Sequence, residues 1–132
     1  MNGSSSTTGP RILIADDDPD ILDLIRFRLG QEGYETVTAT DGQQALDLAR
    51  EHPPDACVLD VMMPKLSGLE VVQAMREDES LREIPLLILT AAVQERDVAR
   101  GFEVGADDYL RKPFSPRALK DRVAALLKPG QG

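Results

Sequence analysis

Along most of the chain, short apolar runs alternate with longer stretches in which apolar residues recur every three or four positions. The short runs predict five strands, because apolar or alternating residues bounded by polar and turn-forming residues are typical of strands. These strands are expected at Ile12–Ala15, Glu35–Thr40, Ala56–Leu59, Leu86–Leu89 and Tyr109–Leu110. Runs with little alternation, such as LLIL, indicate strands that are buried on both faces.

The stretches between and after these runs predict five amphipathic helices. Their apolar residues are spaced so that they fall on one face of each helix. The faces consist of Ile21, Leu22, Ile25 and Leu29; Ala45, Leu46 and Ala49; Leu69, Val72 and Met75; Val98, Ala99 and Phe102; and Leu119, Val123, Leu126 and Leu127. This alternation of strand and helix predicts an α/β fold in which helices cover both faces of a parallel sheet.

The polar ends of the chain bound one predicted domain at residues 11–128. Residues 1–10 (MNGSSSTTGP) are small and polar, and they predict a disordered lead or the remnant of a tag. Residues 129–132 predict a C-terminal tail or the start of a linker. The lead has no basic-then-apolar signal pattern, so we expect a cytoplasmic protein.

Composition excludes several classes of partner. The formal net charge of −8 argues against binding to nucleic acid or to anionic membranes through bulk charge. No apolar stretch approaches the ~20 residues of a membrane-spanning helix. The single cysteine, Cys57, lies inside an apolar run and is expected to be a buried core residue.

Polar residues follow four of the predicted strands. Asp16 and Asp17 follow the first strand, Asp60 the third, Thr90 the fourth and Lys112 the fifth. Because the carboxyl ends of parallel strands meet at one edge of a sheet, we expect these side chains to lie together. Three carboxylates suit a hard divalent cation such as Mg²⁺, which removes the repulsion among them.

The same set of side chains is sufficient for phosphoryl transfer. A carboxylate can act as a nucleophile and form an acyl phosphate. A hydroxyl and an ammonium opposite it would hold the phosphoryl oxygens, and this chemistry depends mainly on positioning and charge stabilisation. Asp18 stands apart from this set, because it precedes Pro19 and is expected to cap the following helix.

At these landmarks the chain resembles the receiver domain of two-component response regulators, the CheY-like superfamily. The resemblance runs through residues 11–128 and rests on Asp16-Asp17, Asp60 in LDVMMPKLSG, Thr90-Ala91 in ILTAA, and Lys112-Pro113-Phe114 in GADDYLRKPF. It implies a flavodoxin-like, doubly wound five-stranded parallel sheet with the strand order 2-1-3-4-5 and five helices.

The resemblance also assigns roles around the metal. It implies that Asp60 is the phosphoacceptor and that Asp17 and Asp60 bind Mg²⁺ directly. Asp16 would act largely through a bound water, and the main-chain carbonyl of Met62 would be a further ligand. The phosphoryl donor would be a sensor histidine kinase or a phosphotransfer protein.

The resemblance further implies a switch. Lys112 would pair with the phosphoryl group and Thr90 would hydrogen-bond to it, while Tyr109 would turn inward as Thr90 moves. The bond before Pro113 is usually cis in this family, which an X–Pro bond tolerates. Phosphorylation would then alter the face built from the fourth helix, fifth strand and fifth helix, and so control an output domain or a downstream protein.

The stretch GADDYLRKPFSPRALKDRV resembles the receivers of winged-helix DNA-binding regulators, which form homodimers through that face. Asp108 and Arg122 match one of their intersubunit ion pairs. Val98 and Ala118 occupy the positions of a second pair, so an apolar contact or a different partner would take its place.

No output domain is present, so we expect an excised or a stand-alone receiver, with no nucleic-acid binding of its own.

Several alternatives remain beside this interpretation. Asp60 could cap a helix, Tyr109 could be a static core aromatic, and a degenerate receiver could serve only as a docking module. A further alternative is an aspartate-based phosphatase, but Met62 stands where such enzymes carry a second aspartate. Met62 and Ala92 offer no group to orient water, so slow self-dephosphorylation is expected.

The charged run at residues 76–83 is expected to be a solvated helix end and loop.

Overall fold

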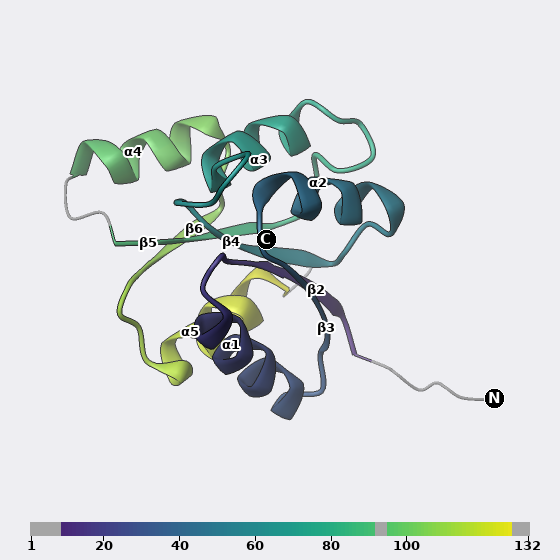
Figure 1. Cartoon of the computed structure of the whole chain (residues 1–132), viewed down its shortest axis with the longest axis vertical. Helices are drawn as coiled ribbons and strands as arrows, with labels where there is room; N and C mark the ends of the chain where they lie inside the picture. Colours follow the sequence, from purple (N-terminus) through teal and green to yellow (C-terminus); the bar gives the residue numbers. More distant parts are fainter. Residues whose placement is uncertain (1–8, 92–94, 128–132) are drawn as a thin grey trace.

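The five strands form a single parallel sheet in the computed structural model, which describes residues 9–91 and 95–127. The strands are β2 (Arg11–Ala15), β3 (Glu35–Ala39), β4 (Ala56–Asp60), β5 (Leu86–Thr90) and β6 (Asp108–Arg111). They lie in the order β3-β2-β4-β5-β6, and every neighbouring pair is parallel (Figure 1). In chain order this is 2-1-3-4-5, so the predicted doubly wound fold is confirmed.

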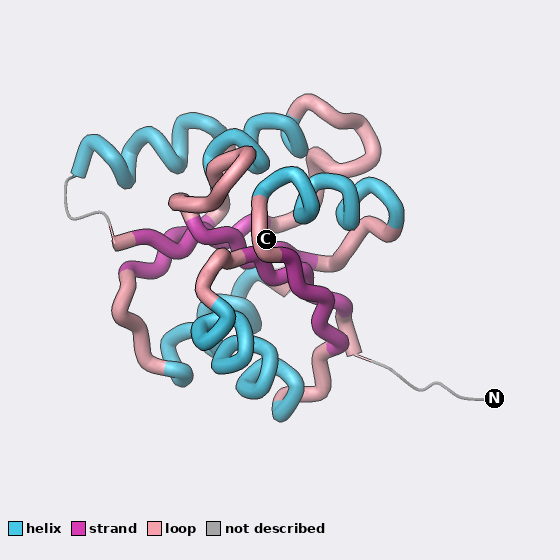
Figure 2. Tube along the Cα trace, in the orientation of Figure 1, coloured by secondary structure: helices cyan, strands magenta, loops and turns pink. Residues whose placement is uncertain are grey.

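Five helices cover both faces of the sheet. They are α1 (Pro19–Gln31), α2 (Gly42–Glu51), α3 (Gly68–Arg76), α4 (Glu95–Val104) and α5 (Pro116–Leu126). Figure 2 shows one layer formed by α1 and α5 and, across the sheet, a second layer formed by α2, α3 and α4. Two buried apolar clusters fill the spaces between the sheet and these layers. Within residues 9–91 and 95–127, no helix has the length and apolar character needed to cross a bilayer.

The apolar runs correspond to the central strands. Every residue of β4 and β5 is buried, because helices cover both faces of the sheet there. The edge strand β3 is mostly half-buried, which accounts for its alternating sequence. Cys57 is fully buried in β4, as its apolar surroundings predicted.

The start of α1 shows the predicted cap. The Asp18 side chain accepts hydrogen bonds from the backbone N–H groups of Asp20 and Ile21, and Pro19 occupies the first helical position. These bonds satisfy N–H groups that the helix itself cannot use. The buried face of α1 is Leu22, Ile25 and Leu29, whereas Ile21 is only half-buried, because it lies about 100° around the helix from Leu22.

The expectation of a solvated segment at residues 76–83 holds for most of the run, because Glu77, Glu79, Ser80, Arg82 and Glu83 are exposed, but Arg76 and Leu81 depart from it. Leu81 is fully buried, and the Arg76 side chain is largely enclosed, with 21% of its area exposed. The reason is that carbonyl groups in two irregular connections need donors, and one guanidinium supplies them. Arg76 donates to the carbonyls of Gly105 (2.9 Å), Arg82 (2.9 Å) and Ile84 (2.8 Å) and to the carboxylate of Asp107 (2.7 Å).

Candidate functional site

Three aspartates meet at the carboxyl edge of the sheet. β2 and β4 are neighbours, with Ala15 opposite Leu59, so the residues that follow lie side by side. Asp16, Asp17 and Asp60 each offer a carboxylate oxygen, and these oxygens all lie within 4.8 Å of one another. Asp16 is fully buried, Asp60 is 4% exposed and Asp17 is exposed to solvent. The cluster therefore has a buried floor and one carboxylate open to solvent.

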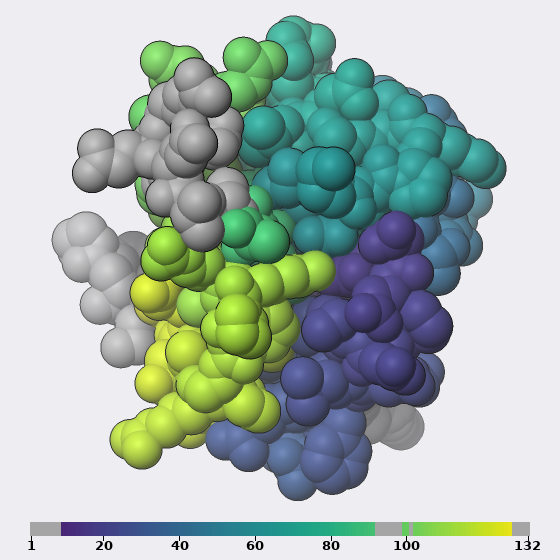
Figure 3. All heavy atoms as spheres, turned by 60° about the vertical axis from the view of Figure 1, so that its left-hand side comes forward, coloured from purple at the N-terminus to yellow at the C-terminus, as the bar shows by residue number. Residues whose placement is uncertain are grey.

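Lys112 supplies the positive charge of the cluster. Its Nζ lies 2.9 Å from Asp16 Oδ2 and 3.2 Å from Asp60 Oδ1. Its backbone N–H donates to the carbonyl of Thr90 (2.8 Å), which ties the residue after β6 to the end of β5. On the face shown in Figure 3, the segments at the ends of β2 (purple), β4 (teal) and β6 (yellow-green) come together. Lys112 was predicted to lie here, but its ion pair with Asp16 was not.

Asp16 and Asp18 have different partners, as the sequence predicted. Asp16 Oδ1 accepts the backbone N–H of Asp18 (2.9 Å), and its Oδ2 accepts Lys112 Nζ (2.9 Å). Both oxygens of this buried carboxylate are therefore satisfied. Asp18 instead directs its side chain at the first turn of α1. A turn thus separates the buried acid of the cluster from the acid that caps the helix.

Gly68 lets α3 start directly against the end of β4. A Cβ at this position would lie 2.3 Å from the backbone carbonyl oxygen of Asp60. The Gly68 N–H donates to the carbonyl of Val61 (2.9 Å), and Ser67 caps α3 together with Glu70. Asp60 is therefore not the cap of this helix, and that alternative is wrong. The Ser-Gly pair before an apolar helical face was the available signal for this close approach.

The cluster shifts the ionisation of its members. Burial raises the pKa of the Asp60 carboxyl, the charge of Asp16 raises it further, and Lys112 only partly opposes this. For Lys112, burial lowers the pKa, but the hydrogen bond to Asp16 and the charges of Asp60 and Asp16 outweigh it and leave the pKa raised. One ammonium thus faces more negative charge than it neutralises. Hard oxygen donors that are short of positive charge fit a divalent cation such as Mg²⁺.

Comparison with known proteins identifies the family. The sequence model of the response regulator receiver domain matches residues 12–124. The chain belongs to the response regulator receiver domain family. This agrees with the strand order and with the four strand ends from which the polar side chains of the cluster come.

The relatives of this receiver domain are about twice its length. It is 46% identical over 118 residues to the alkaline phosphatase synthesis transcriptional regulatory protein PhoP of Bacillus subtilis, covering 89% of this chain and 48% of PhoP. It is 48% identical over 119 residues to the DNA-binding dual master transcriptional regulator RpaA of Synechocystis, covering 90% of this chain and 49% of RpaA. The chain therefore spans about half the length of these relatives.

Solved structures of receivers have the same fold. A response regulator from Chloroflexus aurantiacus is similar with a TM-score of 0.87 and 35% identity, covering 91% of this chain and 98% of that one. The chemotaxis response regulator CheY4 of Vibrio cholerae has a TM-score of 0.87 and 34% identity, covering 91% and 100%. The BeF3-activated DrrB receiver domain has a TM-score of 0.81 and 35% identity, covering 91% and 98%.

The predicted switch residues flank the cluster. Thr90 ends β5 and is 5% exposed, and Tyr109 lies half-buried in β6 opposite Ile88. The peptide bond between Lys112 and Pro113 is cis, as the resemblance implied. The inward movement of Tyr109 stays a prediction. Ala92 lies outside the described residues.

The four predicted interface positions have different surroundings within the single receiver. Asp108 pairs with Arg122 of the same chain at 3.2 Å, and Arg122 also donates to the carbonyl of Tyr109. Ala118 is half-buried against the core beneath α5. Val98 belongs to α4, but its side chain lies outside what the structure describes. The homodimer through this face stays a prediction.

Proposed function

We propose that this receiver domain accepts a phosphoryl group on Asp60 from a sensor histidine kinase or a phosphotransfer protein, in a reaction that requires Mg²⁺. The observation that supports it most is the place of Lys112 Nζ, 2.9 Å from Asp16 and 3.2 Å from Asp60. An ammonium held against the nucleophilic carboxylate is positioned to stabilise the charge of the incoming phosphoryl oxygens.

In the proposed reaction an Asp60 carboxylate oxygen attacks the phosphorus atom. The bond between phosphorus and the donor's leaving atom breaks, and its electron pair leaves with the donor group. The product is an acyl phosphate on Asp60. Lys112 then pairs with one phosphoryl oxygen, and the Thr90 hydroxyl at the end of the neighbouring strand donates to another.

The acidic cluster is the proposed Mg²⁺ site. We assign Asp17 and Asp60 as direct ligands and the main-chain carbonyl of Met62 as a further one. Asp16 acts through a water in this assignment, because both of its oxygens already accept hydrogen bonds from protein groups. When bound, the ion supplies positive charge that offsets the carboxylates and the phosphoryl oxygens.

The proposed output is a change in the face formed by α4, β6 and α5. Thr90 and Tyr109 are the switch residues, and phosphorylation shifts the population of this face. The transcriptional regulators among the relatives support an output segment or downstream protein that acts on transcription, in the cytoplasm. On this face we place the homodimer, with Asp108 and Arg122 in ion pairs and Val98 and Ala118 in an apolar contact.

The proposed receiver is a switch and not an enzyme with turnover. Met62 is 75% exposed beside the site and carries no acid or amide that could orient water against the acyl phosphate. Self-dephosphorylation is therefore proposed to be slow. A second aspartate, which a phosphatase of this general type would need as its acid, is not at that position.

The test is to incubate the receiver with Mg²⁺ and acetyl phosphate and to measure the intact mass. We expect a stable gain of one phosphoryl group that needs Mg²⁺ and that Asp60→Asn abolishes. Asp47→Asn is the matched control, because Asp47 is exposed on α2 and bonds only to Gln43 among the described residues. Beryllofluoride, as used for the DrrB receiver, gives a second readout that needs no donor turnover.

The other outcomes separate the alternatives. Continued consumption of acetyl phosphate without a phosphorylated product would favour a phosphatase. Absence of both the mass gain and beryllofluoride binding would favour a degenerate receiver that serves only for docking. A phosphoryl half-life of seconds would contradict the assignment of Met62.

A further inference from the structure

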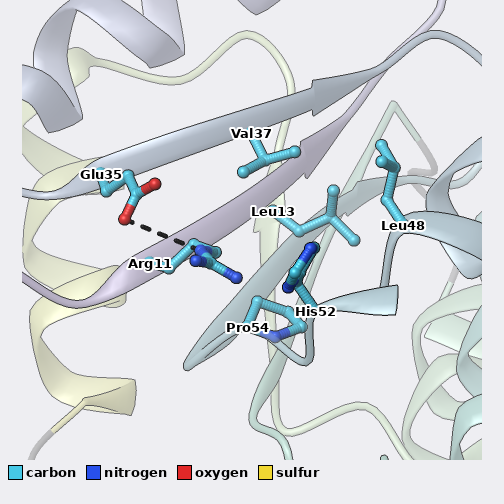
Figure 4. A pocket seen from close by; sticks show the side chains of 7 residues that line it. All are labelled: Arg11, Leu13, Glu35, Val37, Leu48, His52 and Pro54. Atoms are coloured by element: carbon cyan, nitrogen blue, oxygen red, sulfur yellow. Dashed lines mark ion pairs between the residues drawn. The ribbon is translucent and has the colours of Figure 1, made fainter. Parts of the chain in front are cut away.

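A second site candidate lies at the opposite end of the sheet. A hollow of about 180 Å³ opens beside β2, β3 and α2, and is lined by Arg11, Leu13, Glu35, Val37, Leu48, His52 and Pro54 (Figure 4). Arg11 begins β2, whereas Asp16 follows the end of that strand. At the rise of an extended chain, five residues place Arg11 about 16 Å from Asp16. The hollow is thus distinct from the acidic cluster.

The body of the hollow is apolar. Leu13 and Pro54 are buried, and Val37 and Leu48 are half-buried around the opening. Apolar surface that remains uncovered here favours an apolar ligand group, because covering it removes that surface from water. An apolar cavity of about 150 Å³ is large enough to hold benzene, so this hollow suits a group of that size.

A guanidinium with a long ion pair stands at one end of the hollow. In Figure 4 the Arg11 guanidinium lies beside Glu35, and the His52 ring stands above Pro54 toward Leu48. Arg11 Nε is buried and has no hydrogen-bond partner among residues 9–91 and 95–127, and the nearest Glu35 oxygen is 3.7 Å away. This ion pair is long and partly exposed, so a second carboxylate that reaches the exposed part of the guanidinium can add to it.

We propose that this hollow binds a small carboxylate with a compact apolar body, such as an aromatic or branched aliphatic acid. The apolar body fills the space among Leu13, Val37 and Leu48, and the carboxylate accepts hydrogen bonds from Arg11. Guanidinium and carboxylate match in geometry as well as in charge. A neutral molecule of the same shape carries no negative charge to pair with the Arg11 guanidinium.

Glu35 competes with the ligand. Its carboxylate forms an ion pair with Arg11 at 3.7 Å, and its side chain is 49% exposed. It therefore repels an incoming carboxylate and shares the guanidinium with it. Replacing Glu35 by Gln keeps its shape and removes the charge, so Glu35→Gln is expected to bind the carboxylate several times more tightly.

The test is a titration of the ¹⁵N-labelled receiver with sodium benzoate, followed by amide chemical shifts. We expect a dissociation constant on the order of 1 mM, as for other ligands of this size. The largest shifts should fall on Leu13, Val37 and Leu48. Benzyl alcohol, which is similar in shape but neutral, and acetate, which lacks the apolar body, should each bind about tenfold more weakly or worse.

Two arginines provide a matched pair of variants. Arg11→Met keeps most of the side-chain stem and should weaken benzoate binding about tenfold or more. Arg28→Met is the control, because Arg28 does not line the hollow. Its side chain is similarly exposed (29% against 33% for Arg11). Its Nε is also buried without a hydrogen-bond partner among the described residues. Asp60→Asn should bind benzoate as the original chain does.

Several results would overturn the proposal. They are equal binding of benzyl alcohol and benzoate, equal binding by Arg11→Met, weakened binding by Arg28→Met, or shifts centred on Asp60. Failure to see any shift at ten times the expected constant would also overturn it. If Arg11→Met fails to fold, as judged by loss of amide dispersion, the gain in affinity expected for Glu35→Gln decides the question.

Discussion

At the scale of single residues, Lys112 sets the charge balance of the site. It approaches two buried carboxylates that repel each other, and the raised pKa of Asp60 shows that this compensation is incomplete. Without a metal ion, ionised Asp60 therefore costs the folded state free energy. The cost falls on a residue that the proposed reaction uses, which is where such costs are commonly retained.

Removing the charge of Asp60 should stabilise the receiver in metal-free buffer. Because folding raises the pKa of Asp60, the folded state holds this proton more tightly than the unfolded state does. The contribution of Asp60 to the free energy of unfolding therefore falls as pH rises from the ordinary aspartate pKa through the raised value. Asp60→Asn should show a higher Tm at neutral pH, and the difference should shrink toward pH 4.

The measurement is thermal unfolding in EDTA at a series of pH values between about 4 and 7.5, a range that brackets the titration of a carboxyl with a raised pKa. Asp47→Asn serves as the control for removing an exposed acid, and its Tm should follow that of the original chain. A lower Tm for Asp60→Asn at neutral pH would contradict this account of the cluster.

Mg²⁺ should raise the Tm of the original chain at neutral pH. At a free concentration 100 times its dissociation constant, the ion would add about 2.7 kcal/mol to the free energy of unfolding. Asp17→Asn should lose most of this gain, whereas Asp23→Asn, which removes an exposed acid paired with Arg26 on α1, should keep it. An unchanged Tm of the original chain would contradict the Mg²⁺ site, and equal gains in both variants would exclude Asp17 as a ligand.

At the scale of elements, the site depends on where strands end and helices begin. β4 delivers Asp60, and α3 begins so close behind it that Gly68 contacts the Asp60 carbonyl. The Ser67–Glu70 capping box then fixes the first turn of α3. The position of the proposed phosphoacceptor thus depends on a close contact between two elements as well as on the strand.

Gly68→Ala should destabilise the receiver by about 1–3 kcal/mol, the usual cost of forcing extra atoms into a packed contact. The new methyl group would meet the Asp60 carbonyl oxygen at 2.3 Å, so β4 and α3 must separate and Asp60 must move. Urea unfolding measures the cost, and the rate of phosphorylation by acetyl phosphate should fall as well.

Gly30→Ala is the matched control for Gly68→Ala. Gly30 lies in α1, and nothing lies within 4 Å of the position its Cβ would take. Alanine is preferred over glycine in a helix by about 0.5–1 kcal/mol, so this variant should be slightly more stable. Equal effects of the two substitutions would show that the contact with Asp60 is unimportant.

At the scale of the whole molecule, most of the fold could be predicted because its signals are local. The central strands are buried on both faces and read as apolar runs, and helix starts such as Asp18-Pro19 carry their caps in the adjacent sequence. Because the strands were predicted to be parallel, the polar residues that follow them could be placed at one edge of the sheet. The strand order came from the resemblance to a family and not from periodicity.

What could not be predicted are contacts between residues far apart in the chain. Lys112 is 96 residues from Asp16, and a charged residue near a strand end could equally have been solvated. Arg76 lies 29 residues from Gly105, in a run whose many charges indicated a solvated loop. Backbone carbonyls that lack a partner in irregular connections leave no trace in the sequence, so their donor could not be identified.

Arg76 should hold together two connections that the sequence separates. Arg76→Met removes the donors of three carbonyls and the partner of Asp107, so the backbone amides of Leu86 and Asp107 should exchange hydrogen faster by a similar factor. Arg82→Met, which changes an exposed side chain nearby, should leave both rates unchanged. Faster exchange at only one of the two amides would contradict this.

The same guanidinium restricts how α4 can move. Gly105 directly follows the last turn of α4, and its carbonyl accepts a hydrogen bond from Arg76 at the end of α3. Arg76 also pairs with Asp107, the residue before β6. These contacts restrain the carboxyl end of α4, so it acts as a pivot. A displacement that begins at the Thr90 end would be carried as a rotation about residue 105, so its amplitude is largest at the amino end of α4.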